Sequence, residues 1–213
     1  MATLWGASYT FIRIGVETIP PITLIAARTV IAGSLLFAVM TAQRIALPRD
    51  SATWGNFLVQ ALLNSVVPFT LIAWAEQTVE AGLATILNST APIFTALLTW
   101  GLTRHEPVAT RKLVGVAAGL AGVLLIVGTQ ALGGLGQALW AQLALVFAAV
   151  CYAGAAIFGR NFSGLPPIAP AAGSMLCGAA ILVPLSLLVE RPWTLAPSGA
   201  SLLALAGLSL FST

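Results

Sequence analysis

The chain has 213 residues, of which 59% are hydrophobic and only 7% are charged, and its mean hydropathy is +0.99. A soluble globular domain carries about 25% charged residues, so this composition excludes an ordinary water-soluble protein. The 9 Lys and Arg residues are scattered along the chain, so the net charge of +3 forms no basic patch of the kind that binds nucleic acid.

Apolar segments follow one another along the chain, and each is close to the roughly 20 residues that an α-helix needs to cross a bilayer. Eight such segments are present: 2–18, 22–42, 54–75, 81–103, 112–129, 138–159, 168–189 and 198–213. Backbone N–H and C=O groups cannot stay unpaired in lipid, so each segment is expected to be a helix. The segments are longer than membrane-spanning strands and lack their alternation. The sequence therefore predicts an all-α polytopic membrane protein with about eight helices.

Basic residues gather in alternate connections between these segments. The connections after the second, fourth and sixth segments contain Arg44, Arg49, Arg104, Arg111, Lys112 and Arg160. Those after the first, third, fifth and seventh segments contain one basic residue, Arg191. Membrane proteins keep Lys and Arg in their cytoplasmic loops. The first set is therefore predicted to be cytoplasmic, and so is the N-terminus. The predicted location of the protein is the plasma (inner) membrane.

The sequence also resembles itself. FIRIGVETIPPIT at 11–23 is similar to IFGRNFSGLPPIA at 157–169, and both lead from one apolar helix through Pro-Pro into the next. This spacing gives repeats of five helices, and an odd number inverts the second copy in the membrane, as in many secondary transporters. We predict a first repeat over 1–129, with a shortened first helix, and an incomplete second repeat over 137–213. The second would hold helices six, seven and part of eight, which makes the chain a fragment of a ten-helix protein.

Several stretches add a family resemblance. WGASYTFIRIG at 5–15 precedes Pro20-Pro21 and AAR at 26–28, and AGLATILNSTAPIFTALLTW at 81–100 precedes RHEPVATRKLVGVAAGLAGVLLIV at 104–127. In order and spacing these stretches resemble the EamA family of the drug/metabolite transporter superfamily, although His105 stands where that family more often has glycine. The resemblance implies a ten-helix inner-membrane carrier, built from two inverted repeats, that moves amino acids, metabolites or drugs, often outward.

Polar and aromatic side chains within the apolar segments are candidates for a substrate site. Arg28 lies about seven residues into its helix, where a guanidinium is costly unless it faces a partner or a wet cavity. It either holds an anionic group of the substrate, snorkels outward, or pairs with Glu17 or Glu80. Buried amides either line a path or join helices. The predicted cavity-lining residues are Trp5, Tyr9, Arg28, Asn64, Asn88 and Tyr152.

Other residues have structural interpretations. Arg13 is expected to be an interfacial anchor or to pair with Glu17, four residues later. A glycine series on the fifth helix is expected to pack against the fourth helix or against a second protomer, which would make a homodimer: Gly115, Gly119 and Gly122. Three prolines within segments are expected to bend their helices: Pro68, Pro92 and Pro184.

The sequence does not predict an enzyme, because residues that could form an active site are missing from the apolar segments. All 6 acidic residues fall at or near connections, and the one histidine, His105, is also in a connection. We therefore predict no catalytic site, no metal site and no cofactor, and the two cysteines are expected to be packing residues. The predicted function is alternating-access transport of a small organic metabolite, amino acid or drug, in the direction of export. The alternative is a non-transporting membrane receptor or scaffold.

Overall fold

The computed structural model describes residues 2–103, 110–127, 135 and 137–211. Within these ranges, the description leaves out the side chains of 2–6, 102–103, 110, 112–113, 120, 123–124, 126–127 and 211. Arg104, His105 and Glu106, on which part of the charge analysis depends, therefore lie outside the described residues.

All eight predicted segments are helical, and the described residues contain no strand. The helices are α1 (Ala2–Gly15), α2 (Pro21–Ala42), α3 (Ser51–Ala61), α4 (Val67–Ala75), α5 (Ala81–Asn88), α6 (Ala91–Thr103), α7 (Thr110–Val127), α8 (Leu139–Phe158), α9 (Ile168–Val189) and α10 (Gly199–Phe211). Five helical stretches in the described part are long and apolar enough to cross a membrane: Pro21–Ala42, Ser51–Ala75, Ala81–Gly101, Leu139–Phe162 and Ile168–Val189. The prediction of an all-α polytopic membrane protein is confirmed.

Two of the three prolines coincide with irregular turns. A short π-helical segment over Leu62–Val66 joins α3 to α4 just before Pro68. Residues 89–90 form a turn that separates α5 from α6 just before Pro92. Proline has no N–H to donate and its ring clashes with the carbonyl four residues earlier, so the helix widens or breaks there. In contrast, α9 continues through Pro184 from Ile168 to Val189.

Helix ends differ from the prediction where local hydrogen bonds decide them. The first helix ends at Gly15 rather than residue 18, so Glu17 lies in a turn and not on the helix face of Arg13. The third segment begins at Ser51 rather than 54, because the Asp50 carboxylate accepts a hydrogen bond of 2.8 Å from the backbone N–H of Thr53. Hydrogen bonding from Thr53 also lowers the pKa of Asp50 below its ordinary value.

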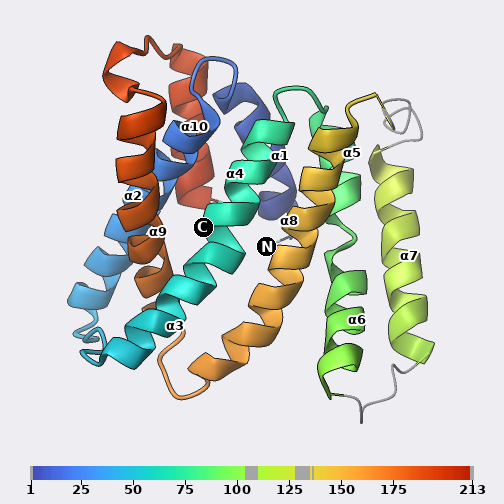
Figure 1. The fold of residues 1–213 in the computed structure, drawn as a ribbon, viewed down its shortest axis with the longest axis horizontal. Coiled ribbons are helices and arrows are strands. Elements are labelled where there is room, and N and C mark those ends of the chain that lie inside the picture. Colours follow the sequence, from blue (N-terminus) through green and yellow to red (C-terminus); the bar gives the residue numbers. More distant parts are fainter. Residues whose placement is uncertain (1, 104–109, 128–134, 136, 212–213) are drawn as a thin grey trace.

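The described connections lie alternately at the two ends of the bundle (Figure 1). The α1–α2, α4–α5 and α9–α10 connections lie at one end, which we name the acidic end because it carries Glu17, Glu76, Glu80 and Glu190. The α2–α3 and α8–α9 connections lie at the opposite, basic end, which carries Arg44, Arg49 and Arg160. The alternation that the charges indicated is therefore present in the fold.

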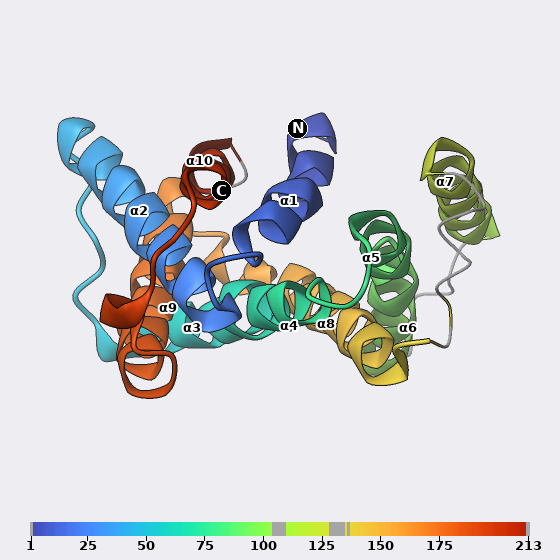
Figure 2. The same ribbon diagram turned by 90° about the horizontal axis from the view of Figure 1, so that it is seen from above.

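The helix pairs follow a pattern that relates the two parts of the chain. Among α1–α4 and α8–α10, the main pairs between the two parts are α1 with α10, α2 with α9, α3 with α9, α4 with α8, and α2 with α10, while α8 also contacts α5 and α6. If α1, α2 and the α3–α4 helix are exchanged with α8, α9 and α10 respectively, the pair of α2 with α9 is unchanged and the other four pairs exchange with one another. Helix α7 stands at the edge of the bundle, next to α5 and α6 (Figure 2).

The glycine series of α7 does not pack as predicted. A Cβ added to Gly115, Gly119 or Gly122 would meet no atom of the described residues within 4 Å. Within the described residues, this glycine face therefore does not make the expected close packing against the fourth helix. Contact with a second protomer stays a prediction.

Gly173 of α9 makes room for Phe57 of α3. Phe57 is fully buried, its ring centroid lies 5.6 Å from those of both Trp54 and Phe162, and a Cβ on Gly173 would overlap it. We expect Gly173→Ala to destabilise the protein by about 1–3 kcal/mol, because the ring cannot move into its packed neighbours. Thermal unfolding in detergent measures this.

The matched control is Gly55→Ala, two residues before Phe57 on α3, where an added Cβ meets nothing within 4 Å. This substitution should leave stability unchanged or raise it slightly. Equal melting temperatures for the two variants would contradict the assigned contact.

Candidate functional site

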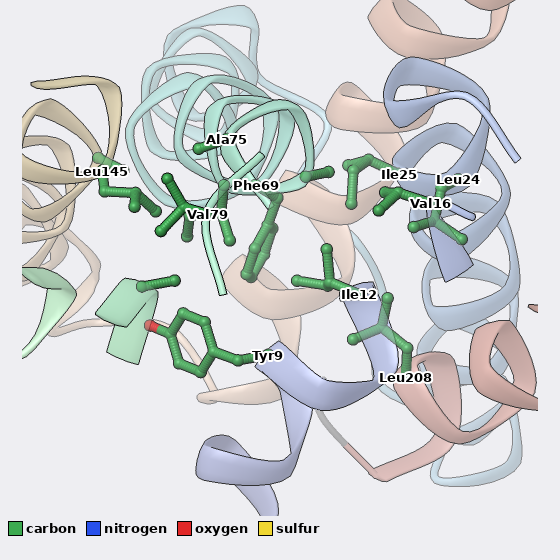
Figure 3. Close-up of a cluster of buried hydrophobic side chains, with 14 of the residues drawn as sticks. Tyr9, Ile12, Val16, Leu24, Ile25, Phe69, Ala75, Val79, Leu145 and Leu208 are labelled. Atoms are coloured by element: carbon green, nitrogen blue, oxygen red, sulfur yellow. The ribbon is translucent and has the colours of Figure 1, made fainter. Parts of the chain in front are cut away.

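A small cavity lies in the centre of the main hydrophobic core. It is lined by Ser8, Tyr9, Ile12, Phe69, Ile72 and Tyr152, which come from α1, α4 and α8. Tyr9 and Ile12 reach from α1 to the region of Phe69 on α4 (Figure 3). Its empty volume is about 230 Å³ including the opening. Because that figure includes open space outside the side chains, the room they enclose is far smaller than the roughly 300–1,000 Å³ of sites that hold small organic ligands, so the cavity is nearly closed in this conformation.

The hydroxyl of Tyr9 is bound by an amide from another helix. Asn88 Nδ2 donates a hydrogen bond to Tyr9 Oη, and both residues are buried. Asn88 is the last residue of α5, directly before the break that precedes Pro92, so the break fixes where its side chain points. Asn88 Oδ1 accepts no hydrogen bond from the described residues and is buried. The wall of the cavity thus holds a polar pair with one unused acceptor.

Arg28 brings a positive charge next to the cavity, against the lining residue Phe69. It is only 1% exposed, and its Cζ lies 3.7 Å from the centre of the Phe69 ring. Phe69 in turn meets Tyr152 edge-on, with 5.9 Å between ring centroids, and Arg28 and Tyr152 interact electrostatically. A cation over an aromatic face is stabilised by about 2 kcal/mol when it is removed from water. Arg28 therefore stays inside the bundle and does not snorkel outward.

The acidic end is tied by hydrogen bonds between the two parts of the chain. The Glu190 carboxylate, at the end of α9, accepts hydrogen bonds from the backbone N–H of Ile22 (3.1 Å) and from Thr23 N (2.6 Å) and Oγ1 (2.7 Å). It thereby caps the N-terminus of α2, where the first N–H groups have no partner within the helix and a negative charge is favourable. Thr23 Oγ1 also lies 2.8 Å from Ser186 Oγ.

A second cluster joins α1 to α10 at the same end. Thr18 Oγ1 donates to Ser201 Oγ at 2.7 Å, and the N–H of Ser198 donates to Thr18 Oγ1 at 3.1 Å. Ser201 Oγ also donates to the carbonyl of Ile14 at 2.9 Å. At the basic end, the contact of α2 with α9 is an apolar cluster of Met40, Ala169 and Ala172.

The sequence model of the EamA-like transporter family matches residues 1–128. This chain belongs to that family. The match runs from α1 to the end of α7. Together with the helices long enough to cross a membrane, it shows that the chain is a multi-pass membrane protein of this family.

Relatives extend the similarity beyond the matched EamA region. The uncharacterized inner membrane transporter YedA of Escherichia coli K12 is 29% identical over 99% of this chain and 67% of its own length. The uncharacterized transporter YoaV of Bacillus subtilis 168 is 26% identical over 88% of this chain and 64% of its own length. A protein of known crystal structure has a TM-score of 0.75 and 22% identity, covering 99% of this chain and 71% of that one. It shows the shared fold.

The structure of this EamA chain brings four of the six predicted site residues together. Tyr9 and Tyr152 line the cavity, and Asn88 and Arg28 contact lining residues. Asn64 is half-buried in the π-helical segment and does not line the cavity. Trp5 lies in α1, but its side chain is outside the described residues.

Sequence reasoning missed three features of the site region. Phe69 was one apolar residue among many, and only its place directly after Pro68 marks it. Arg13 does not use Glu17: its Nη1 donates to the backbone carbonyl of Glu76. Glu76 itself is 0% exposed, although it follows the end of α4 and was expected to be a loop residue. The proximity of α1 to the end of α4 is a tertiary contact, which no local pattern indicates.

Proposed function

We propose that the protein is a secondary transporter that carries a small organic anion or zwitterion through the membrane by alternating access. The observation that carries this proposal is the buried guanidinium of Arg28, stacked on Phe69 beside a cavity lined by Tyr9 and Tyr152. A charge in a membrane protein's interior is costly and commonly marks a substrate pathway. The relatives YedA and YoaV, both named as transporters, support the same function.

The chemistry of the walls favours a substrate with a carboxylate and an apolar or aromatic part. A guanidinium binds a carboxylate through two parallel hydrogen bonds, and tyrosine and phenylalanine rings accept a flat apolar group. Asn88 Oδ1 adds an acceptor for an ammonium or hydroxyl group. An amino acid or a related metabolite or drug meets these requirements, and the family resemblance favours export.

The pairing of helices supports the alternating-access mechanism. Exchange of α1–α4 with α8–α10 maps the main contacts between these two groups of helices onto one another, as expected for repeats over 1–129 and 137–213 that rock against each other. The polar clusters around Glu190 and Thr18 close the acidic end, whereas the α2–α9 contact at the basic end is apolar. With the basic end in the cytoplasm, this conformation is closed to the outside.

The experiment is a counterflow assay with the complete protein in proteoliposomes. The probes are radiolabelled aromatic and aliphatic amino acids, a dicarboxylate and an aromatic cationic drug. At least one anionic or zwitterionic probe should accumulate against excess unlabelled compound inside the vesicles, and empty vesicles should accumulate none. Binding that raises the melting temperature without any flux would instead favour the receptor or scaffold. Flux of the cationic drug alone would contradict the assigned role of Arg28.

A further inference from the structure

Glu76 is the one acidic residue in the described part of the chain whose carboxylate is fully buried with both oxygens lacking a hydrogen-bond donor. It directly follows the membrane-spanning stretch Ser51–Ala75, in the turn that leads to α5. An ionised carboxylate in this situation is expensive by several kcal/mol, because neither water nor a protein donor replaces its hydration.

The position of Glu76 connects it with the cavity. Ile72, which lines the cavity, is four residues earlier on the same helix face, so Glu76 lies one turn from the cavity toward the acidic end. On α1 the same spacing separates Tyr9, which lines the cavity, from Arg13, whose guanidinium is bound to the backbone carbonyl of Glu76. Helices α1 and α4 therefore run alongside each other here: Tyr9 and Ile72 lie at the level of the cavity, and Arg13 and Glu76 lie one turn closer to the acidic end.

The charged and titratable groups around Glu76 are few. Arg13 and Tyr9, both on α1, interact electrostatically with it. Helix α5 has no titratable residue, and Glu80, at the end of the α4–α5 turn, is exposed. Arg28 of α2 and Tyr152 of α8 interact with each other. Burial raises the pKa of Glu76 to about 9, against an opposing effect of Arg13.

We propose that Glu76 is the proton-binding site of the transporter, and that the acidic end closes over it only after its carboxylate has taken up a proton. When the acidic end is open, water hydrates the carboxylate, which exchanges its proton with that water; when the basic end opens instead, the proton leaves to the water that enters the cavity one turn away. Closing then requires that a proton from the medium bind to a carboxylate oxygen and form its O–H bond. The proposal rests on the alternating-access function above and adds protons as the coupling ion.

The test follows opening of the acidic end directly, without any substrate. Ile19, a buried residue in the α1–α2 connection, is replaced by cysteine in a complete protein whose free Cys151 and Cys177 are changed to alanine. The rate of labelling by a water-soluble maleimide is measured from about pH 6 to about pH 10 in this parent protein and in the same protein with Glu76→Gln. At each pH the rate of the parent is divided by the rate of the Glu76→Gln variant. This ratio removes the intrinsic pH dependence of the thiol.

We expect the labelling rate of the parent, divided by that of Glu76→Gln, to rise at least tenfold between about pH 6 and about pH 9 and to level off above that range. The control, Glu80→Gln, removes an exposed carboxyl from the same turn and should behave like the parent protein. A ratio that stays constant with pH, or a Glu76→Gln variant that opens with the parent's pH dependence, would overturn the proposal.

Transport measurements provide a second test of proton binding at Glu76. In vesicles with an imposed pH gradient, Glu76→Gln should keep counterflow of the transported probe and lose accumulation driven by the gradient. Accumulation equal to that of the parent would overturn proton binding at Glu76. If no probe is moved by the parent protein, the transport function fails, while the labelling ratio still tests the proton site.

Protonation of Glu76 also predicts how the stability of the folded protein changes with pH. The unfolded chain holds this proton only below about pH 4.5, whereas the folded protein holds it to about pH 9. The folded state therefore binds more protons between these values, and stability falls as pH rises through this window. Melting temperatures of the parent should decrease over it, and those of Glu76→Gln should be less dependent on pH. Parallel curves would contradict the burial of an ionisable carboxyl.

Discussion

Replacement of Arg28 by glutamine lowers the initial rate of counterflow by about 10- to 100-fold in our account, because a charge-assisted hydrogen bond to a substrate carboxylate is worth about 1.5–3 kcal/mol. Glutamine keeps a hydrogen-bond donor, but its side chain is two bonds shorter and has no charge. Arg28→Lys should also be impaired, since an ammonium lacks the planar face that stacks on Phe69 and the fork that fits a carboxylate. Rates over a range of probe concentrations measure whether the loss is in binding.

Arg44→Gln is the matched control, because Arg44 is an exposed residue in a connection at the basic end. It should leave counterflow unchanged. Size-exclusion profiles and melting temperatures establish that Arg28→Gln is folded, which is expected because the change removes a costly buried charge. A folded Arg28→Gln protein that transports each probe at the parent's rate would remove Arg28 from the binding site and leave it a packing residue.

Glu190→Ala should open the acidic end and slow exchange. The substitution leaves the N–H groups of Ile22 and Thr23 and the Thr23 hydroxyl without their acceptor. Loss of a capping carboxylate costs about 0.5–2 kcal/mol, and hydrogen bonds to a charged acceptor raise this figure. A shift of about 2 kcal/mol changes the ratio of closed to open molecules by roughly 30-fold. Maleimide labelling of the Ile19→Cys reporter should therefore accelerate by about that factor.

Glu17→Ala is the control for this second effect, since Glu17 is an exposed acid at the same end. Its labelling rate should match that of the parent. Glu190→Gln, which retains one carbonyl acceptor, should fall between the parent and Glu190→Ala. If Glu190→Ala labels no faster than Glu17→Ala, the hydrogen bonds to α2 do not hold the acidic end closed.

The helices and four residues of the candidate site could be predicted because lipid imposes strong rules on sequence. An apolar segment in a bilayer must be helical, so even the interrupted α5–α6 segment was located. Arg28, Asn88, Tyr9 and Tyr152 were recognisable because polar atoms stand out among apolar neighbours, and all four converge in the core.

The remaining features depend on tertiary contacts that have no local signal. Phe69 differs from other apolar residues only through its contacts with Arg28 and Tyr152. Glu76 has the sequence context of a loop, and its burial results from the packing of α1 over the end of α4. The glycines of α7 have the spacing of a packing face, but the described helices do not cover that face.

The central claim, that one cavity is reached alternately from both sides of the membrane, is tested most directly at Ser8, a buried residue that lines it. A Ser8→Cys protein without its native cysteines is exposed to a membrane-impermeant maleimide, in right-side-out vesicles and separately in inverted vesicles. We expect labelling from both sides, slowed from both sides by a transported probe. Labelling from one side only, whatever the probe or pH, would contradict alternating access.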